Sequence, residues 1–270
     1  MTTEASVRFP GATFRSMDEF KRFRADNRDL FDERYRREQS LGVDDASLTT
    51  GGFCAPCLEV TDFISQTHGG SATANGRWVP HWRLTQACGC RFALTSHERA
   101  LLHIALPRLG PPSWTRGGII GRGDRLLDYL TERAFSFDLW PRLLWDETGR
   151  AKLPVPAQSQ HMILAADELA HIPPLDRALA AIASSLMPGG SFLFSTPFDV
   201  EAEDSVTAPW IEGVAPTDLP LFSADAAHRL GWDLITRLHD AGFTDAAASC
   251  YWSEELGYLG PYNMIFLAFR

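Results

Sequence analysis

The sequence lacks any apolar run near the roughly 18 residues that a membrane-spanning helix requires. Its first twenty residues, MTTEASVRFPGATFRSMDEF, have neither the basic start nor the apolar core of a secretory signal. Positive charge is also scarce, because 25 Lys and Arg stand against 34 Asp and Glu, for a net charge of −9. We therefore expect a cytoplasmic protein that binds neither membranes nor nucleic acid, since a nucleic-acid surface needs positive charge.

The rest of the composition is that of an ordinary globular protein. Hydrophobic residues make up 45% of the 270 residues and charged residues 22%. A chain of this length can form one large domain, or a main domain with a small added module. A core of normal size is available, so metals or disulfides are not needed merely to reach stability.

The first part of the chain predicts a helical arm, which we place at residues 1–45. Aromatic and apolar residues recur at broadly helical intervals among dense charges: Phe14, Phe20, Phe23, Leu30, Phe31 and Tyr35. This pattern is typical of a polar amphipathic helix with a narrow apolar stripe. The stripe has two interpretations, packing on the domain edge or a lid over a pocket. Packing is favoured, because an aromatic stripe at helical spacing usually packs.

Residues 46–96 contain four of the five cysteines and predict a small loop-and-hairpin module. Cys54-x2-Cys57 is followed by Cys88-x-Cys90, while Cys250 stands alone as a buried thiol. In a reducing cytosol such clustering indicates a metal more than disulfides. Four thiolates suit a tetrahedral zinc site, which would be closed and structural.

Two alternatives stay open for this module. The Cys-x-Cys spacing is less usual than Cys-x2-Cys, so His68, His81 or His97 is a possible replacement for one thiolate ligand. The other alternative is a set of free buried cysteines, which the pairing makes the poorer interpretation.

Residues 97–270 alternate between helical and strand patterns. The expected helices cover 96–109, 125–135, 174–186 and 227–243, and the expected strands cover 118–120, 135–140, 161–167, 191–198, 245–253 and 263–270. A long acidic, Pro-rich loop is expected at 199–227. This alternation predicts an α/β domain with a mostly parallel sheet covered by helices, closed by an antiparallel strand pair.

One stretch of this domain resembles a known family. The segment ILAADELAHIPPLDRALAAIASSLMPGGSFLFSTPF, residues 163–198, is similar to the second half of class I S-adenosylmethionine-dependent methyltransferases, with LxPGG as its most specific part. LITRLHDAGF resembles the family's last helix, and YWSEELGYLG with NMIFLAFR its final strands, so the resemblance spans about residues 110–270. Upstream, CAPC, WRLTQACGC and HERALL follow in the order seen in members with an N-terminal cysteine module.

The resemblance implies a Rossmann-like sheet with helices on both faces and a site for S-adenosylmethionine after the first strand. There the family has a glycine-rich loop, whereas this chain has GGIIGRGDRLLDYL. The implied cofactor contacts are Gly121, Gly123, Asp124, Asp167 and, as the acid for the ribose hydroxyls, Asp138. The alternative makes GRGD an ordinary surface turn and Asp138 a strand-end carboxylate.

A second departure follows the strand at 161–167. The family often has Glu-His where this chain has Ala170 and His171, although Asp167 and Glu168 remain at the strand end, where α/β sheets place their ligands. His171, with Asp167, is the candidate catalytic group because an imidazole titrates near neutral pH. The alternative is that His171 caps or packs the next helix. Candidates for the substrate side are Trp210, His228, Trp232 and Tyr258.

The sequence thus favours a methyltransferase acting on a small molecule, a sugar or a natural-product intermediate, with structural Zn²⁺. The alternative keeps the fold but gives it a lost or repurposed cofactor site, for a cyclisation, elimination or rearrangement, or a non-catalytic partner role. Nucleic-acid binding through the cysteine module is disfavoured, because that module has no run of Lys or Arg.

Overall fold

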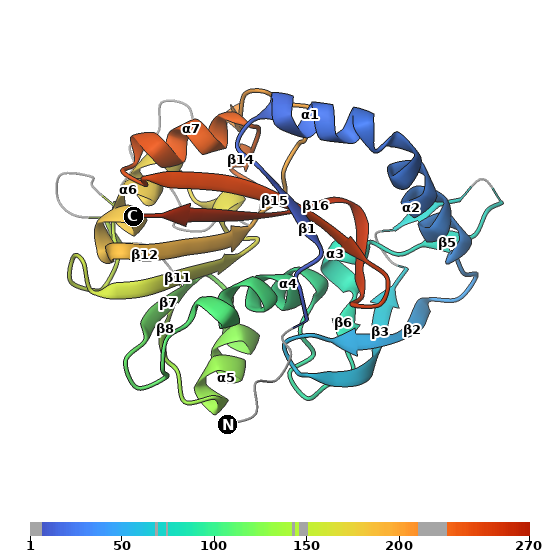
Figure 1. The fold of residues 1–270 in the computed structure, drawn as a ribbon, viewed down its shortest axis with the longest axis horizontal. Helices are drawn as coiled ribbons and strands as arrows, with labels where there is room; N and C mark the ends of the chain where they lie inside the picture. Colours follow the sequence, from blue (N-terminus) through green and yellow to red (C-terminus); the bar gives the residue numbers. More distant parts are fainter. Residues whose placement is uncertain (1–6, 68–69, 74, 142–143, 146–150, 210–225) are drawn as a thin grey trace. The chain divides into compact units, whose positions relative to one another are not determined.

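The computed structural model describes residues 7–67, 70–73, 75–141, 144–145, 151–209 and 226–270 (Figure 1). The chain forms two compact units. One, which we call the cysteine unit, consists of Met1–Ala12, Asp18–Arg108 and Cys250–Asn263. The other, the sheet unit, consists of Thr13–Met17, Leu109–Ser249 and Met264–Arg270. Each is described by itself.

Most of a seven-stranded sheet, with the order β1-β15-β16-β12-β11-β7-β8, lies in the sheet unit. Its strands are β1 Gly11–Phe14, β7 Arg116–Ile120, β8 Ser136–Trp140, β11 Gln160–Ala166, β12 Leu186–Ser195, β15 Asp245–Ser253 and β16 Tyr258–Phe269. Strands β8, β7, β11 and β12 are mutually parallel, and β16 runs antiparallel to β12. The predicted α/β class is confirmed, and the sheet is mixed, with these four parallel strands on one side of the antiparallel β16.

The order of the parallel strands reverses between β7 and β11. The chain passes from β7 through α5 (Asp124–Glu132) out to β8, and from β11 through α6 (Leu175–Ser185) in the opposite direction to β12. Right-handed crossovers in opposite directions place their helices on opposite faces of a sheet. Figure 1 accordingly shows α5 on one face and α6 with α7 (Asp233–Asp240) on the other. Helices on both faces are therefore confirmed.

The central strands are apolar because both of their faces are covered. Ile163, Leu164 and Ala165 of β11 are fully buried, as a strand between two helical layers requires. The adjacent β7 uses glycines for a different reason. A Cβ on Gly117 would lie 2.3 Å from the Phe137 ring, and one on Gly118 would lie 2.0 Å from the Trp140 ring. Large rings on β8 thus cover a glycine surface on β7.

Two predicted segments differ from the structure. The helix expected at 227–243 spans only α7, because His228–Arg229 form strand β14 and pair with β13, Val206–Thr207. Polar contacts hold this segment extended: the His228 ring lies 3.2 Å from Thr207 Oγ1 and 3.2 Å from Ile172 O. The strand expected at 191–198 begins earlier, at Leu186, so the PGG segment lies within β12, where Gly189 has a φ of 77° and its N–H donates to Arg270 O at 2.7 Å.

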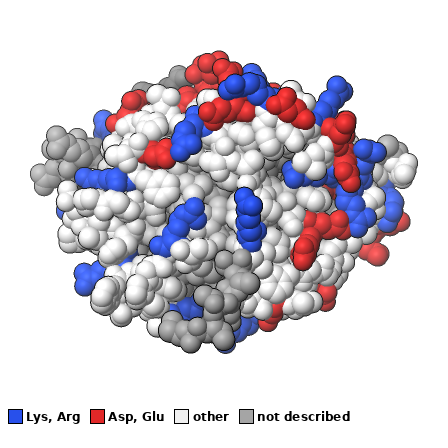
Figure 2. All heavy atoms as spheres, viewed as in Figure 1, with Lys and Arg blue, Asp and Glu red and all other residues white. Residues whose placement is uncertain are grey.

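The cysteine unit begins with the predicted helical arm, α1 (Met17–Asp26) and α2 (Arg28–Ser40). Acidic and basic side chains intermix along both helices in Figure 2. Phe20 is fully buried, and its ring lies 5.8 Å from that of Tyr262 in an edge-to-face contact. The arm therefore packs, as the favoured interpretation predicted.

The rest of this unit is the predicted loop-and-hairpin region with one long helix. Its strands are β2 Ser47–Cys54, β3 Glu59–Gln66 and β6 Ala87–Cys88 in one sheet, with β4 Ser71–Ala72 paired to β5 Trp78–Val79. Helix α3 spans Trp82–Thr85 and α4 spans Ser96–Ala105, followed by a 3-10 turn at Leu106–Arg108. Thr95 caps α4, because its side chain and that of Glu98 form a reciprocal capping box.

Short elements complete the described chain. Strands β9 Leu144–Trp145 and β10 Ala151–Lys152 pair with each other, and a 3-10 turn covers Leu169–His171. Among the described residues, no helix is long and apolar enough to cross a membrane.

Candidate functional site

Four cysteines of the cysteine unit come together at the end of the β2–β3 hairpin. Cys54 is the last residue of β2, and Cys57 lies in the turn that leads into β3. Cys88 lies in β6, directly opposite Phe63 of β3, and Cys90 follows two residues later. The pairing of β6 with β3 therefore brings the second Cys pair to the first.

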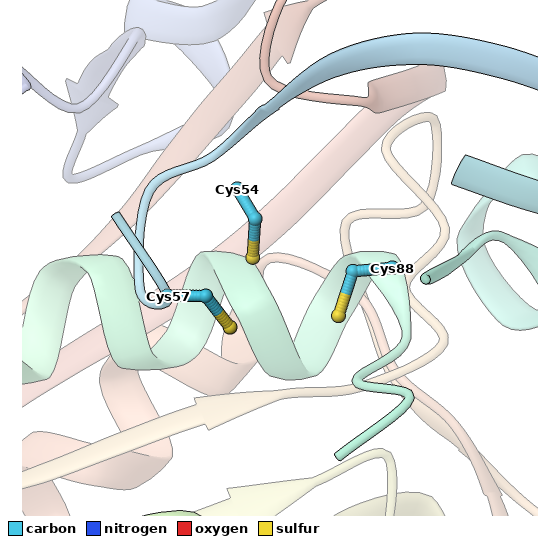
Figure 3. Close-up of side chains that lie close together, drawn as sticks. All are labelled: Cys54, Cys57 and Cys88. Atoms are coloured by element: carbon cyan, nitrogen blue, oxygen red, sulfur yellow. The ribbon is translucent and has the colours of Figure 1, made fainter. Parts of the chain in front are cut away.

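The thiols lie close to one another in two overlapping groups that share Cys57. Figure 3 shows the Cys54, Cys57 and Cys88 side chains pointing to a common centre, with their sulfurs within 4.8 Å of one another. Cys90 Sγ lies 2.7 Å from Cys88 Sγ and 3.5 Å from Cys57 Sγ. The sulfurs of a tetrahedral zinc site lie roughly 3.8 Å apart, given Zn–S bonds of about 2.3 Å. The Glu59 carboxylate forms a second possible ligand group with Cys57 and Cys90.

The surroundings of Cys54 lower the pKa of its thiol. Hydrogen bonds from Cys57 and Cys88, with a smaller contribution from the charge of Arg99, lower the pKa of Cys54 to about 4. The pKa of Cys57 is raised, because its proton is held in the bond to Cys54. Thiolate is the form of cysteine that binds metals, so the cluster is set up for a cation.

A buried guanidinium lies beside the cluster. Arg99 of α4 is completely buried, and it donates to the backbone oxygens of Gln86, Leu94 and Gly257 at 3.1, 3.0 and 2.6 Å. Its Cζ lies 4.3 Å from the centre of the Phe63 ring. No carboxylate of the described residues forms an ion pair with it. A buried charge requires compensation, and the thiolates are the available negative groups.

Two of the three histidines left open as zinc ligands, His81 and His97, are absent from the thiol cluster. His97 Nδ1 is 3.0 Å from Arg83 O, and within the part of the chain that the structure describes neither His81 nor His97 joins a group of metal-ligating atoms. His68 lies outside the described residues.

The second candidate site lies in the sheet unit, where the strand order reverses between β7 and β11. Ligands of open α/β sheets bind outside the carboxyl ends of the strands at such a reversal. Gly121 follows β7 directly, and its N–H donates at 2.9 Å to Trp140 O at the end of β8. Asp167 and Glu168 follow β11. The predicted glycine loop and the predicted acidic strand end are thus brought to the same edge of the sheet.

Glu168 connects the two loops. Its carboxylate Oε1 accepts from the Arg122 N–H at 2.9 Å and from Arg122 Nε at 3.3 Å. The Glu168 side chain is buried, whereas that of Arg122 is 82% exposed. No described residue donates to the other oxygen, Oε2. Gly121 has a φ of 89°, and a Cβ there would lie 2.1 Å from Glu168 Cγ, so the glycine makes room for this carboxylate.

The other loop residues have local roles that the structure makes plain. Gly123 is buried at the start of α5, and a Cβ there would lie 2.2 Å from Ile119 Cγ2, so close helix–strand packing requires it. Asp124 is the exposed first residue of α5, where a carboxylate is favourable to the helix dipole. Asp138 lies in the middle of β8, opposite Gly118, and is not at the carboxyl end of the strand.

Polar groups also gather after β11 and β12. Asp167 adopts a φ of 60°, and its N–H donates to Ser195 O at 3.0 Å and Ser195 Oγ at 3.2 Å. Thr196, which follows Ser195, is completely buried, and its hydroxyl has no hydrogen-bond partner among the described residues. His171 is half-buried in the 3-10 turn that follows, and its N–H donates to Glu168 O at 2.9 Å.

The residues expected on the substrate side are mostly engaged in packing. His228 is buried with both ring nitrogens occupied, and Trp232 is buried and donates to Val200 O at 3.0 Å. Tyr258 is completely buried in the cysteine unit, its hydroxyl 3.2 Å from His103 Nδ1. Trp210 lies outside the described residues.

Several groups of these sites were not assigned a role from the sequence. Glu168 carried a signal, as a charged residue directly after a buried strand, and Arg122 lies within the GRGD motif. Arg99 and Thr196 carried no signal in the sequence. What sets Arg99 apart is its burial without a described carboxylate partner, and what sets Thr196 apart is a buried hydroxyl without a described hydrogen-bond partner.

Comparisons with known proteins give weak similarities. No family model matches the sequence, and no curated protein matches it. The structure of the citrinin polyketide synthase CMeT domain is similar at 15% identity and a TM-score of 0.40, covering 66% of this chain and 52% of that one. An S-adenosylmethionine-dependent methyltransferase from Mesorhizobium loti is similar at 15% identity and a TM-score of 0.39, covering 63% of this chain and 98% of that one. A SAM-dependent methyltransferase from Archaeoglobus fulgidus is similar at 14% identity and a TM-score of 0.40, covering 63% of this chain and 92% of that one. The fold assignment rests on the strand order and not on these similarities.

Proposed function

We propose that the protein is an S-adenosylmethionine-dependent methyltransferase acting on a small molecule, a sugar or a natural-product intermediate. The observation that carries the proposal is the reversal of strand order between β7 and β11, with the Gly121 turn and Glu168 at its carboxyl edge. The sequence resemblance over residues 110–270 points the same way.

The chemistry of this edge fits the cofactor. S-adenosylmethionine carries a sulfonium and an ammonium, and Glu168 is a buried carboxylate with one oxygen unbonded by any described residue. The Thr196 hydroxyl is a further buried polar group in need of a partner. We assign Gly121, Gly123, Asp167 and Glu168 to cofactor binding, while the roles of Asp124 and Asp138 stay predictions.

When bound, the cofactor would supply an activated methyl group, and the protein's share is chiefly positioning. His171 ends the 3-10 turn that begins directly after Glu168. In the proposed reaction its imidazole would take a proton from the methyl-accepting atom. That catalytic role, with Asp167 beside it, stays a prediction.

Calorimetric titration with S-adenosylmethionine and S-adenosylhomocysteine tests the proposal. We expect micromolar binding that Glu168→Gln weakens at least tenfold, because the amide keeps the size of the side chain and loses its charge. Asp128→Asn, the same kind of change at an exposed position of α5, is the control and should bind as the wild type. Absence of binding to either ligand would contradict the proposal.

One observation favours the second candidate, a methyltransferase-like fold without methyl transfer. The Glu168 side chain packs against Gly121, in the space that a ligand approaching this turn would use. Should neither ligand bind while Glu168→Gln and wild type unfold alike, this candidate would replace the first, and a reaction such as elimination or rearrangement would be sought.

For the cysteine unit, we propose a closed structural Zn²⁺ site formed by Cys54, Cys57, Cys88 and Cys90. The convergence of the sulfurs and the buried Arg99 support it, because four thiolates around Zn²⁺ carry a net charge of −2 that a guanidinium offsets. Such a site would stabilise a region that has few apolar residues of its own.

Metal analysis and cobalt substitution test this site. We expect one metal per chain and, with Co²⁺, the absorption of thiolate coordination, both lost in Cys54→Ser and retained in the control Cys250→Ser. Glu59→Gln should leave the cobalt spectrum unchanged if Cys90 is the fourth ligand. Metal-free protein that folds and unfolds like the metal-loaded one would contradict the assignment.

A further inference from the structure

A cavity of about 310 Å³ lies within the cysteine unit, on the inner side of the helical arm. One wall is a face of α2, with residues at helical spacing, and the other is formed by β15 and β16. The α2 wall consists of Phe31, Arg34, Tyr35 and Glu38, and the opposite wall includes Cys250, Trp252 and Tyr262. Its volume is in the range of pockets that bind small organic molecules.

Arg34 is the unusual group of this cavity. Its guanidinium carbon lies 5.6 Å from the centre of the Phe31 ring and 5.3 Å from that of Trp252. Its Nε is buried and has no hydrogen-bond partner. No described residue accepts a hydrogen bond from Arg34 or forms an ion pair with it. Burial lowers the pKa of Arg34, which reports the cost of desolvating this cation.

Glu38, four residues further along α2, is the expected partner but is already engaged. Its Oε1 accepts from Trp252 Nε1 at 2.7 Å and from the Gly260 N–H at 2.9 Å. Arg37 of the same helix shows the usual arrangement, since its Nε donates to Glu254 Oε2 at 2.8 Å. The fold therefore satisfies Arg37 and leaves Arg34 without an acceptor. A guanidinium in this state gains most from a bidentate anion.

The walls around Arg34 are flat and aromatic. The Phe31 and Tyr262 rings lie 5.6 Å apart, and Tyr35 is 59% exposed at the cavity. Such surfaces favour a planar ring over a flexible chain. The neighbouring carboxylates of Glu38 and Asp32 disfavour a doubly charged phosphate more than a singly charged carboxylate.

We propose that this cavity binds a small aromatic carboxylate, whose carboxylate pairs with Arg34 and whose ring packs against the aromatic wall of Phe31, Trp252 and Tyr262. The geometry within one unit carries this assignment, so it holds whether or not the protein transfers methyl groups.

Calorimetry with three matched probes tests the class of ligand: phenylacetate, the neutral phenylacetamide and benzylphosphonate. We expect phenylacetate to bind at least tenfold more tightly than phenylacetamide, since the charged hydrogen bonds to Arg34 are lost with the amide. Tighter binding of benzylphosphonate would overturn the carboxylate assignment, and no binding of any probe would overturn the site.

Two variants on α2 test whether Arg34 binds the carboxylate. Arg34→Met keeps the apolar stem of the side chain and should reduce phenylacetate affinity at least tenfold without lowering the melting temperature of the free protein. Arg36→Met, an exposed neighbour bonded to Asp32 O, is the control and should bind normally.

Glu38→Gln provides a second, independent test. The amide oxygen can still accept from Trp252 and Gly260, while the repelling charge is gone, so phenylacetate should bind more tightly. Unchanged affinity in Arg34→Met, or weaker binding in Glu38→Gln, would refute the proposed mode.

Discussion

Replacing Gly121 with alanine is expected to destabilise the sheet unit by about 2.5–5 kcal/mol. The left-handed backbone, with φ of 89°, accounts for roughly 1–2 kcal/mol of this, because Cβ is unfavourable there. The new Cβ would also lie 2.1 Å from Glu168 Cγ and 2.9 Å from Glu168 Cβ, so the whole side chain must move. Moving it forfeits the charged hydrogen bonds with Arg122, roughly 1.5–3 kcal/mol.

Gly189→Ala is a matched control. Gly189 has a φ of 77°, but a Cβ there would meet nothing within 4 Å. It should therefore show the backbone cost alone, roughly 1–2 kcal/mol. The excess cost of Gly121→Ala over Gly189→Ala then isolates the conflict with Glu168.

Urea unfolding followed by circular dichroism measures both variants, and a double-mutant cycle completes the test. In a Glu168→Gly background the conflict is absent, so Gly121→Ala should cost no more than Gly189→Ala. The reasoning is refuted if Gly121→Ala and Gly189→Ala cost the same, or if the penalty at 121 survives the removal of Glu168.

Further predictions concern single contacts. Glu38→Ala should cost about 2–4 kcal/mol of unfolding free energy, because it leaves the Trp252 indole and Gly260 N–H donors unpaired. Glu38→Gln should be neutral or stabilising, since burial raises the pKa of Glu38 and the amide keeps the acceptor; equal losses in urea unfolding would contradict this. Burial lowers the pKa of His228, so the unfolded chain binds more protons than the folded one as the pH falls. The free energy of unfolding should therefore decrease from about pH 7 to about pH 5, and less so in His228→Gln; equal pH dependences of the two proteins would count against this. Arg270→Met should cost about 1.5–3 kcal/mol, because Arg270 donates to three backbone oxygens at the end of α6, those of Ala183, Ser184 and Leu186; thermal unfolding that matches wild type would exclude such a cap.

The periodicity of the sequence determined most of the architecture. Buried runs such as 161–167 and amphipathic stretches such as 125–135 depend on short-range pattern, and they appear as β11 and α5. The spacing of the cysteines likewise identified the thiol cluster, because a hairpin turn brings Cys54 and Cys57 together whatever the rest of the chain does.

Local pattern failed where a distant partner decides the conformation. Residues 227–232 have a helical pattern, yet contacts with Thr207 and Ile172 hold His228 in a strand pair. The strand predicted at 118–120 includes Gly118 and extends in the structure back to Arg116, but only the Phe137 and Trp140 rings explain why positions 117 and 118 have no side chain.

The sequence by itself thus determined the α/β class, the order of the elements, the thiol cluster and the two loops at which a ligand is expected. Tertiary structure alone decided that Glu168 lies over Gly121, that Arg99 is buried beside the thiols, and that Arg34 lacks an acceptor while Arg37 has one. The physical reason is that strand and helix patterns follow from neighbours in sequence, whereas the state of a charge depends on what residues far along the chain place around it.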